Sequence, residues 1–150
     1  MIRPDFNQHI FDIIDNVAKR STCLRRQVGA VAVREGRIIA TGFNGAPSKV
    51  KHCTDIGSCL RETLKVPSGE RHELCRGVHA EQNVIIQAAK NGVELNGTVL
   101  YCNVKPCIIC AKMIINVGIQ TVIYTDDYND AGEVEDMMSC KVQLIRFVRS

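Results

Sequence analysis

Two short segments carry the residue types of a hydrolytic metal site. The first is His79-Ala80-Glu81, and the second is Pro106-Cys107-Ile108-Ile109-Cys110. Zinc in proteins takes imidazole and thiolate ligands in a tetrahedral array, and a site with three protein ligands leaves the fourth position to water, whose pKa then falls to about 7. His79, Cys107 and Cys110 are three such ligands. Glu81 is then free to act as a proton shuttle.

Each of these residues alone also has an ordinary structural interpretation. A histidine at a helix start can be a polar cap, and a glutamate in a first turn interacts favourably with the helix dipole. Two cysteines with apolar neighbours can be core residues or a redox pair. All four in this order, with Pro106 before the first cysteine, form the signature of zinc enzymes that deaminate nucleobases. We therefore interpret the set as a catalytic zinc site with an open position.

Length and composition restrict the class of protein. At 150 residues we expect a single domain over 1–150. The start of the chain lacks the apolar run of a signal peptide, and no stretch approaches the roughly 20 apolar residues of a membrane span. We expect a cytoplasmic protein, in the host cytoplasm if the source is viral, without a membrane partner. A net charge of +3 and 5% aromatic residues do not favour a nucleic-acid surface.

The expected elements bring the two motifs to neighbouring helix starts. Apolar spacing predicts helices over 4–20, 79–91, 107–117 and, more weakly, 134–138. Runs of β-branched residues predict strands over 28–33, 37–42, 98–104, 121–125 and 142–147. The class is α/β, with a hairpin after the first helix and a β-α-β unit over 98–125. Open α/β sheets place their sites at strand ends, beside such helix starts.

Residues 45–76 are predicted to form an insertion, which we call the insertion below. Glycine and proline interrupt it, and the pattern predicts only a short helix near 58–64. Such a segment needs its own anchor, and a closed structural zinc site supplies one. The expected ligands of this second metal are Cys23, Cys53, His72 and Cys75, with Cys59 as a substitute for one of them. Buried free thiols are the alternative, and we expect Cys102 and Cys140 to be packing residues.

Four segments together resemble a known family. Residues 23–30 (CLRRQVGA), 42–47 (GFNGAP), 79–83 (HAEQN) and 107–116 (CIICAKMIIN) are similar to the cytidine and deoxycytidylate deaminase superfamily, in particular to the bacterial and phage deoxycytidylate (dCMP) deaminases. The resemblance implies a cytidine deaminase-like three-layer α/β/α fold with a central five-stranded mixed sheet. It implies hydrolysis of dCMP to dUMP and ammonia, a step toward thymidylate. It also implies homo-oligomers, commonly hexamers, with dCTP as activator, dTTP as inhibitor and Mg²⁺ accompanying these nucleotide effectors.

The resemblance also assigns roles to individual residues. The two motifs keep the ligand and acid–base roles given above. Asn44 would hydrogen-bond the sugar, and the backbone at Ala80 would meet the base. For the substrate phosphate we favour Arg26, with Arg25 and Tyr124 as further candidates.

Other functions stay open at this point. A tRNA adenosine deaminase shares both motifs but needs a basic RNA-binding face. A deaminase of deoxycytidine or cytidine is separated from a dCMP deaminase by the Arg25-Arg26 pair and the insertion. A catalytically inactive, zinc-containing regulatory module would have no need of Glu81. Gln82, Asn83 and Lys90 are either solvated helix positions or part of a subunit interface or effector site.

Overall fold

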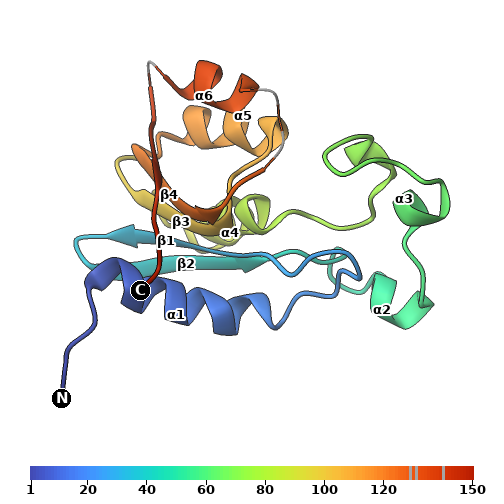
Figure 1. Cartoon of the computed structure of the whole chain (residues 1–150), viewed down its shortest axis with the longest axis horizontal. Coiled ribbons are helices and arrows are strands. Elements are labelled where there is room, and N and C mark those ends of the chain that lie inside the picture. The colour runs from blue at the N-terminus through green and yellow to red at the C-terminus, as the bar shows by residue number, and fades with distance from the viewer. Residues whose placement is uncertain (129, 131, 140) are drawn as a thin grey trace.

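A mixed sheet forms the middle layer of the computed structural model, which describes residues 1–128, 130, 132–139 and 141–150. Its five strands lie in the order β2-β1-β3-β4-β5 (Figure 1). They are β1 (Gly29–Arg34), β2 (Arg37–Phe43), β3 (Val99–Val104), β4 (Thr121–Asp126) and β5 (Gln143–Arg146). β1 is antiparallel to β2 and β3, whereas β3, β4 and β5 run parallel. The predicted five-stranded mixed sheet is confirmed.

Helices cover both faces of this sheet (Figure 1). On one face lies α1 (Phe6–Ala18), whose buried Phe11 packs in a core with Val31 and Tyr101 of the sheet. The other face carries α4 (Ala80–Asn91), α5 (Ile108–Val117) and α6 (Glu133–Met138), and its core includes Ala30 and Leu100. Neighbouring strand residues enter opposite cores because side chains alternate along a strand. The three-layer α/β/α prediction is therefore confirmed.

The ends of α4 and α5 follow the sequence pattern closely. His79 and Cys107 immediately precede the two helices, and Gly92 and Gly118 end them in the left-handed conformation. Because both helices pack on the same face, their starts lie next to each other. None of the helices in the described ranges is long and apolar enough to span a membrane.

Gly42 fixes the distance between α4 and the sheet. A Cβ atom at this position would lie 2.3 Å from the carbonyl oxygen of Ala80 and 2.7 Å from the amide nitrogen of Val84. Asn83 reinforces the contact, because its Nδ2 donates to the carbonyl of Phe43 at 2.7 Å. Any larger residue at position 42 would therefore displace the start of α4, and His79 with it.

The insertion lies outside the sheet and contains only short helices (Figure 1). These are α2 (Cys53–Ile56), α3 (Leu60–Thr63) and the 3-10 turn η1 (His72–Leu74). A two-bond antiparallel bridge between Gly45 and Val78 closes its base. Between residues 46 and 76, all of which the structure describes, the buried residues are Cys59 and Arg61. The insertion thus has no buried aliphatic or aromatic side chain of its own, and a thiol and a guanidinium take that place.

Candidate active site

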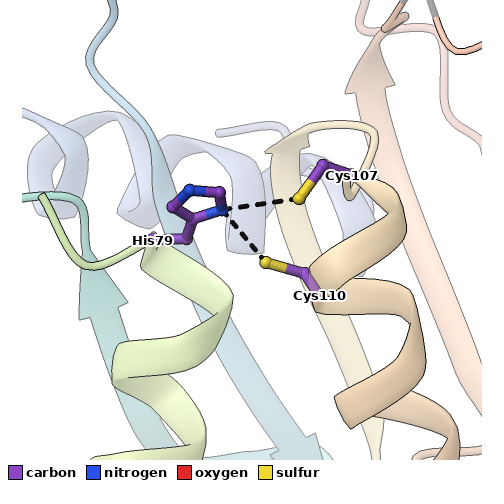
Figure 2. A group of neighbouring side chains, drawn as sticks. All are labelled: His79, Cys107 and Cys110. Atoms are coloured by element: carbon purple, nitrogen blue, oxygen red, sulfur yellow. Dashed lines mark hydrogen bonds between the residues drawn. The ribbon is translucent and has the colours of Figure 1, made fainter. Parts of the chain in front are cut away.

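The three predicted zinc ligands meet at the starts of α4 and α5. Figure 2 shows the His79 ring pointing at both sulfur atoms, with Nδ1 3.2 Å from Sγ of Cys110 and 3.5 Å from Sγ of Cys107. All ligand atoms of the three residues lie within 4.8 Å of one another. Across the described part of the chain, this is the only group of three or more His, Cys, Asp or Glu side chains gathered so tightly.

These distances fit a tetrahedral zinc ion. Zn–S bonds of about 2.3 Å and Zn–N bonds of about 2.0 Å at tetrahedral angles separate the nitrogen from each sulfur by about 3.5 Å. The observed separation from Cys107 is 3.5 Å and that from Cys110 is 3.2 Å, so one ion fits between the three atoms after a small side-chain movement. The sulfur atoms are shielded from solvent, since Cys107 is 6% and Cys110 1% exposed.

The local charges also prepare the site for a cation. The hydrogen bond from Cys110 lowers the pKa of Cys107 to about 4, with a further contribution from His79. The hydrogen bond with Cys107 in turn raises the pKa of His79. Cys107 is therefore a thiolate at neutral pH, which is the form that binds metal.

Glu81 lies beside the three ligands without belonging to the ligand group. The side chain is 5% exposed, and its Oε1 accepts a hydrogen bond from Sγ of Cys102 at 3.0 Å. Burial keeps the pKa of Cys102 well above its usual value, so this residue stays a thiol donor. Cys102 is a fully buried packing residue, as predicted, but it also fixes the orientation of Glu81. Strand alternation is the signal for this, because it turns Cys102 toward α4.

A pocket of about 150 Å³ opens onto these residues. His79, Glu81 and Cys107 contribute to its wall, and so do four of the predicted substrate-binding residues: Arg25, Arg26, Asn44 and Ala80. Its remaining polar lining includes Arg61, Lys105 and Tyr128. One cavity is thus lined by two of the three candidate metal ligands, the candidate acid Glu81 and several positive charges.

Asn44 holds the backbone next to Arg26. Its Oδ1 accepts from the amide of Val28 at 2.9 Å, and its Nδ2 donates to the carbonyl of Arg26 at 2.8 Å. The Arg26 side chain is 44% exposed and lies 3.8 Å from a carboxylate oxygen of Asp126. This long, exposed ion pair leaves the guanidinium available to a ligand.

Tyr124 is not brought into the pocket. It is buried in β4, where it pairs with Cys102 of β3 and Arg146 of β5. The tyrosine that lines the pocket is Tyr128, in the loop after β4, and its hydroxyl lies 3.5 Å from Nε2 of His72. The reason is geometric: the strand ends at Asp126, and only the following loop turns back over the pocket.

The cysteines of the predicted second metal site gather at another part of the same pocket. Cys23, Cys53, Cys59 and Cys75 all line it. Burial raises the pKa of Cys53, and the other three thiols raise it further. Backbone amides of Arg25 and Gly77 donate to the sulfur atoms of Cys23 and Cys75, each at 3.4 Å. The four residues are called the cysteine cluster below.

His72 lies next to the first metal site, not with the cysteine cluster. Its ring packs edge-on against the His79 ring, with 5.0 Å between the ring centroids. Burial lowers the pKa of His72, so the neutral ring is favoured. Of the predicted set, Cys23, Cys53 and Cys75 line one pocket together with Cys59 and His72. Among the described residues, these side chains do not form a group as tight as that of His79, Cys107 and Cys110. Cys140 lies outside the described residues.

Two of the helix positions left open by the sequence have internal partners. Gln82 accepts a hydrogen bond from the amide of His79 at 2.8 Å, and Asn83 binds Phe43 as described above. Lys90 is exposed near the end of α4. Gln82 and Asn83 therefore position the start of the catalytic helix.

A buried ion cluster supports the segment that leads into α5. Lys105 is 3% exposed, and its Nζ lies 3.0 Å from Oδ1 of Asp130, in contact with Glu135 and 3.9 Å from Asp127. The cluster connects the end of β3 to the loop after β4 and to α6. Because Cys107 follows two residues after Lys105, the same contacts help to place a metal ligand. The sequence analysis did not identify this cluster, since its members are scattered along the chain.

Comparison with known proteins identifies the family. The family model described as "Cytidine and deoxycytidylate deaminase zinc-binding region" matches residues 4–126. The deoxycytidylate deaminase of Schizosaccharomyces pombe is 35% identical over 97% of this chain, which spans only 45% of that protein, and the deoxycytidylate deaminase of Mycobacterium phage D29 is 34% identical over 83% of this chain and 97% of its own length. The crystal structure of the dCMP deaminase from cyanophage S-TIM5, in complex with dCMP and dUMP, is 26% identical with a TM-score of 0.77 and covers 98% of this chain and 100% of its own. This chain therefore belongs to the cytidine and deoxycytidylate deaminase family.

Proposed function

We propose that this protein hydrolyses dCMP to dUMP and ammonia. The observation that carries the proposal is a buried carboxylate, Glu81, held next to a three-ligand metal group in a pocket lined by arginines. The deoxycytidylate deaminases among its relatives and the cyanophage enzyme with dCMP and dUMP support this substrate. The positive side chains of the pocket match a nucleotide better than an uncharged nucleoside.

Zinc fits the group of His79, Cys107 and Cys110, which would hold it in the enzyme. When bound, it supplies the acidification of the attacking water. No other His, Cys, Asp or Glu side chain among the described residues joins these three, which would leave room for the attacking water. Metal binding requires both sulfur atoms as thiolates and His79 as the neutral ring, so the affinity would fall as the pH is lowered.

Glu81 would move the protons of the reaction. Water adds to C4 of the pyrimidine while one of its protons passes to the carboxylate of Glu81, which delivers it to N3. The second proton follows the same route to the amino group. The C4–N bond then breaks and ammonia leaves, so the reaction consumes one water and leaves Glu81 ionised as before. The hydrogen bond from Cys102 holds Oε1 and leaves Oε2 directed toward the metal group.

We also propose a second, structural zinc ion in the cysteine cluster. Three of its residues come from the insertion and Cys23 comes from the segment after α1, so a metal bound there would join the insertion to the main body. Backbone amides already donate to the sulfur atoms of Cys23 and Cys75, which fixes their orientation in the cluster. Four thiolates make a closed site, which contributes to folding and not to catalysis.

The remaining expectations from the family resemblance also stay proposals. They are activation by dCTP, inhibition by dTTP, Mg²⁺ bound with these effectors, and assembly into a homo-oligomer such as a hexamer. A cytoplasmic location agrees with the free thiols, because all cysteines in the described ranges are unpaired and zinc thiolates need a reducing compartment.

The experiment that tests the function is a substrate comparison. Initial deamination rates would be followed by ultraviolet absorbance for dCMP, CMP, deoxycytidine and adenosine in a tRNA anticodon stem, each with and without dCTP. We expect a rate confined to dCMP, and dependence on dCTP would establish the regulation. Activity on deoxycytidine alone would contradict the nucleotide specificity, and no activity on any of the four would favour a regulatory zinc module.

A further inference from the structure

Arg61 occupies an unusual position for an arginine. It lies in α3 of the insertion, is 9% exposed, and lines the same pocket as His79 and Glu81. The insertion contributes a single other buried residue between positions 46 and 76, namely Cys59 of the cysteine cluster. A charged side chain is therefore buried where a small module would ordinarily place an aliphatic one.

The charge of Arg61 has no internal counter-charge. Its Nη2 donates to the carbonyl of Pro67 at a long 3.5 Å, and its buried Nε has no hydrogen-bond partner. No carboxylate of the described residues lies within ion-pair distance of it. Lys105, the other buried cation, touches three carboxylates. A buried, unpaired guanidinium is costly unless a ligand neutralises it, and a phosphate does so with two parallel hydrogen bonds.

Arg61 lines the pocket together with Arg26 and Tyr128. Burial raises the pKa of Tyr128, and the charges of Arg61 and Arg26 both oppose that rise, so both positive charges act on this part of the pocket lining. Arg25, which also lines the pocket, has a buried Nη1 without a hydrogen-bond partner. The pocket is thus lined by unsatisfied guanidinium nitrogens from two separate segments. Among the described residues, Glu81 is the one carboxylate of its lining, and Arg25 also forms a long ion pair of 3.7 Å with Glu62, which lies outside that lining.

We propose that Arg61 binds the 5′-phosphate of the substrate, so that the insertion determines the preference for a nucleotide over a nucleoside. This inference rests on the proposed deamination of dCMP. The sequence analysis did not identify Arg61 as a binding residue, because a single arginine in a segment without regular periodicity does not indicate a function. Arg26 and Arg25, which line the same pocket from the segment before β1, then become its partners, and the phosphate connects the insertion to the main body.

The test compares dCMP with deoxycytidine in Arg61→Gln, Arg61→Lys and a matched control, all without triphosphates. The control is Arg71→Gln in the same insertion, because Arg71 is 60% exposed in its side chain and pairs with Glu73. Loss of charge-assisted hydrogen bonds should lower kcat/KM of Arg61→Gln for dCMP about 10- to 100-fold and that for deoxycytidine less than about threefold. Arg61→Lys should fall between Arg61→Gln and the wild type. Arg71→Gln should resemble the wild type on both substrates.

Equal losses on both substrates in Arg61→Gln would overturn the inference, because they would indicate a disturbed pocket instead of a lost phosphate contact. Unchanged rates in Arg61→Gln would overturn it as well. Calorimetric binding of dUMP and deoxyuridine provides a readout that needs no turnover. We expect Arg61→Gln to weaken dUMP binding selectively.

The same measurements separate this inference from the proposed function. A wild type that deaminates neither dCMP nor deoxycytidine would contradict the proposed function. Arg61 would then be judged by binding of inorganic phosphate alone. If the wild type binds phosphate and Arg61→Gln does not, the anion site stands without the reaction, and equal binding by both proteins would overturn it.

Discussion

The metal site at the sheet and the insertion are built in opposite ways. His79 and Cys107 directly precede helices that pack on the buried face of the sheet, and Gly42 brings α4 into direct contact with β2. In the insertion, the helices are single turns, and the buried residues between 46 and 76 are Cys59 and Arg61. The first region derives its geometry from apolar packing, whereas the second lacks such packing, and we propose that bound ions order it.

This difference matches the two tasks that we assign to the regions. Proton transfer requires that Glu81 be held within hydrogen-bond reach of the reacting atoms, which a rigid scaffold provides. Phosphate recognition needs a less exact position of the donor, here Arg61. The bound phosphate itself would supply the counter-charge that Arg61 lacks. We therefore expect changes near the sheet to affect chemistry or global stability, and changes in the insertion to affect metal content and substrate choice.

The largest effect is expected for Glu81→Gln. This change preserves the shape of a buried side chain but removes its proton-transfer capacity, so kcat for dCMP should fall about 10²- to 10⁴-fold. Zinc content and thermal midpoint should stay near those of the wild type. The control is Glu73→Gln, which alters an exposed carboxylate of the insertion. If Glu81→Gln kept kcat within tenfold, roughly 1.4 kcal/mol, another group would have to move the protons.

Asp130→Asn should lower stability on the sheet side. Breaking a buried pair costs about 3–5 kcal/mol, but Glu135 and Asp127 continue to neutralise Lys105, so we expect about 2–3 kcal/mol. Asp127→Asn serves as control, because that side chain is 59% exposed and 3.9 Å from Nζ, and it should cost less than about 1 kcal/mol. Urea unfolding followed by circular dichroism measures both.

The ion pair of Lys105 and Asp130 also makes the stability of the protein depend on pH. Burial raises the pKa of Asp130, but the hydrogen bonds from Lys105 and from two backbone amides lower it overall from 3.8. A depressed carboxyl pKa stabilises the fold above the unfolded pKa and loses that contribution as the pH falls through the folded pKa. The wild type should therefore lose stability below about pH 4, and Asp130→Asn should lack this part of the acid transition. Identical acid slopes in the two proteins would contradict the assignment.

The sequence predicts the region at the sheet better than the insertion. The helices and strands of 79–125, and the proximity of His79, Cys107 and Cys110, were predictable from short patterns. The apolar period, the capping residues and the ligand spacing each extend over only a few residues. The cysteine cluster was predictable only as a set, since its members are far apart along the chain. Its fourth member was ambiguous between Cys59 and His72, because a histidine with ligand spacing can equally line the neighbouring pocket.

Other contacts carried no local signal at all. Lys105 and Asp130 are separated by 25 positions, and only the tertiary fold brings them together. Tyr124 was a further phosphate candidate, but it lies within β4, which continues to Asp126, and Tyr128 of the following loop lines the pocket instead. The proposed roles of Arg61 and Cys102 follow only from properties of the folded chain. Both side chains are buried; the Nε of Arg61 has no hydrogen-bond partner, whereas the thiol of Cys102 donates to Glu81.

Cys53→Ser should act on the insertion and spare the sheet. Zinc per chain should fall from about two to one, and hydrogen exchange should accelerate over 45–76 while the strands stay protected. Cys59→Ser should have the same effect if Cys59 is a ligand, and His72→Gln should retain both metal ions. Inductively coupled plasma mass spectrometry and exchange mass spectrometry measure the two outcomes. A single zinc in the wild type would contradict the second site, and metal loss in His72→Gln would restore His72 as its ligand.

The smallest effect is expected at Cys102, and it decides whether packing alone orients Glu81. Cys102→Val keeps an apolar group of similar size in a site that is 0% exposed, but it removes the donor to Oε1 of Glu81. Cys102→Ser retains a donor and loses some packing. A neutral hydrogen bond contributes about 1 kcal/mol, so kcat should fall about three- to tenfold in Cys102→Val and less in Cys102→Ser. Because thermal stability should follow the reverse order, with Cys102→Ser the less stable variant, activity and stability separate the two roles. If kcat instead followed stability across the pair, Cys102 would be a packing residue only, and the rigidity of the sheet-side site would come entirely from its apolar core.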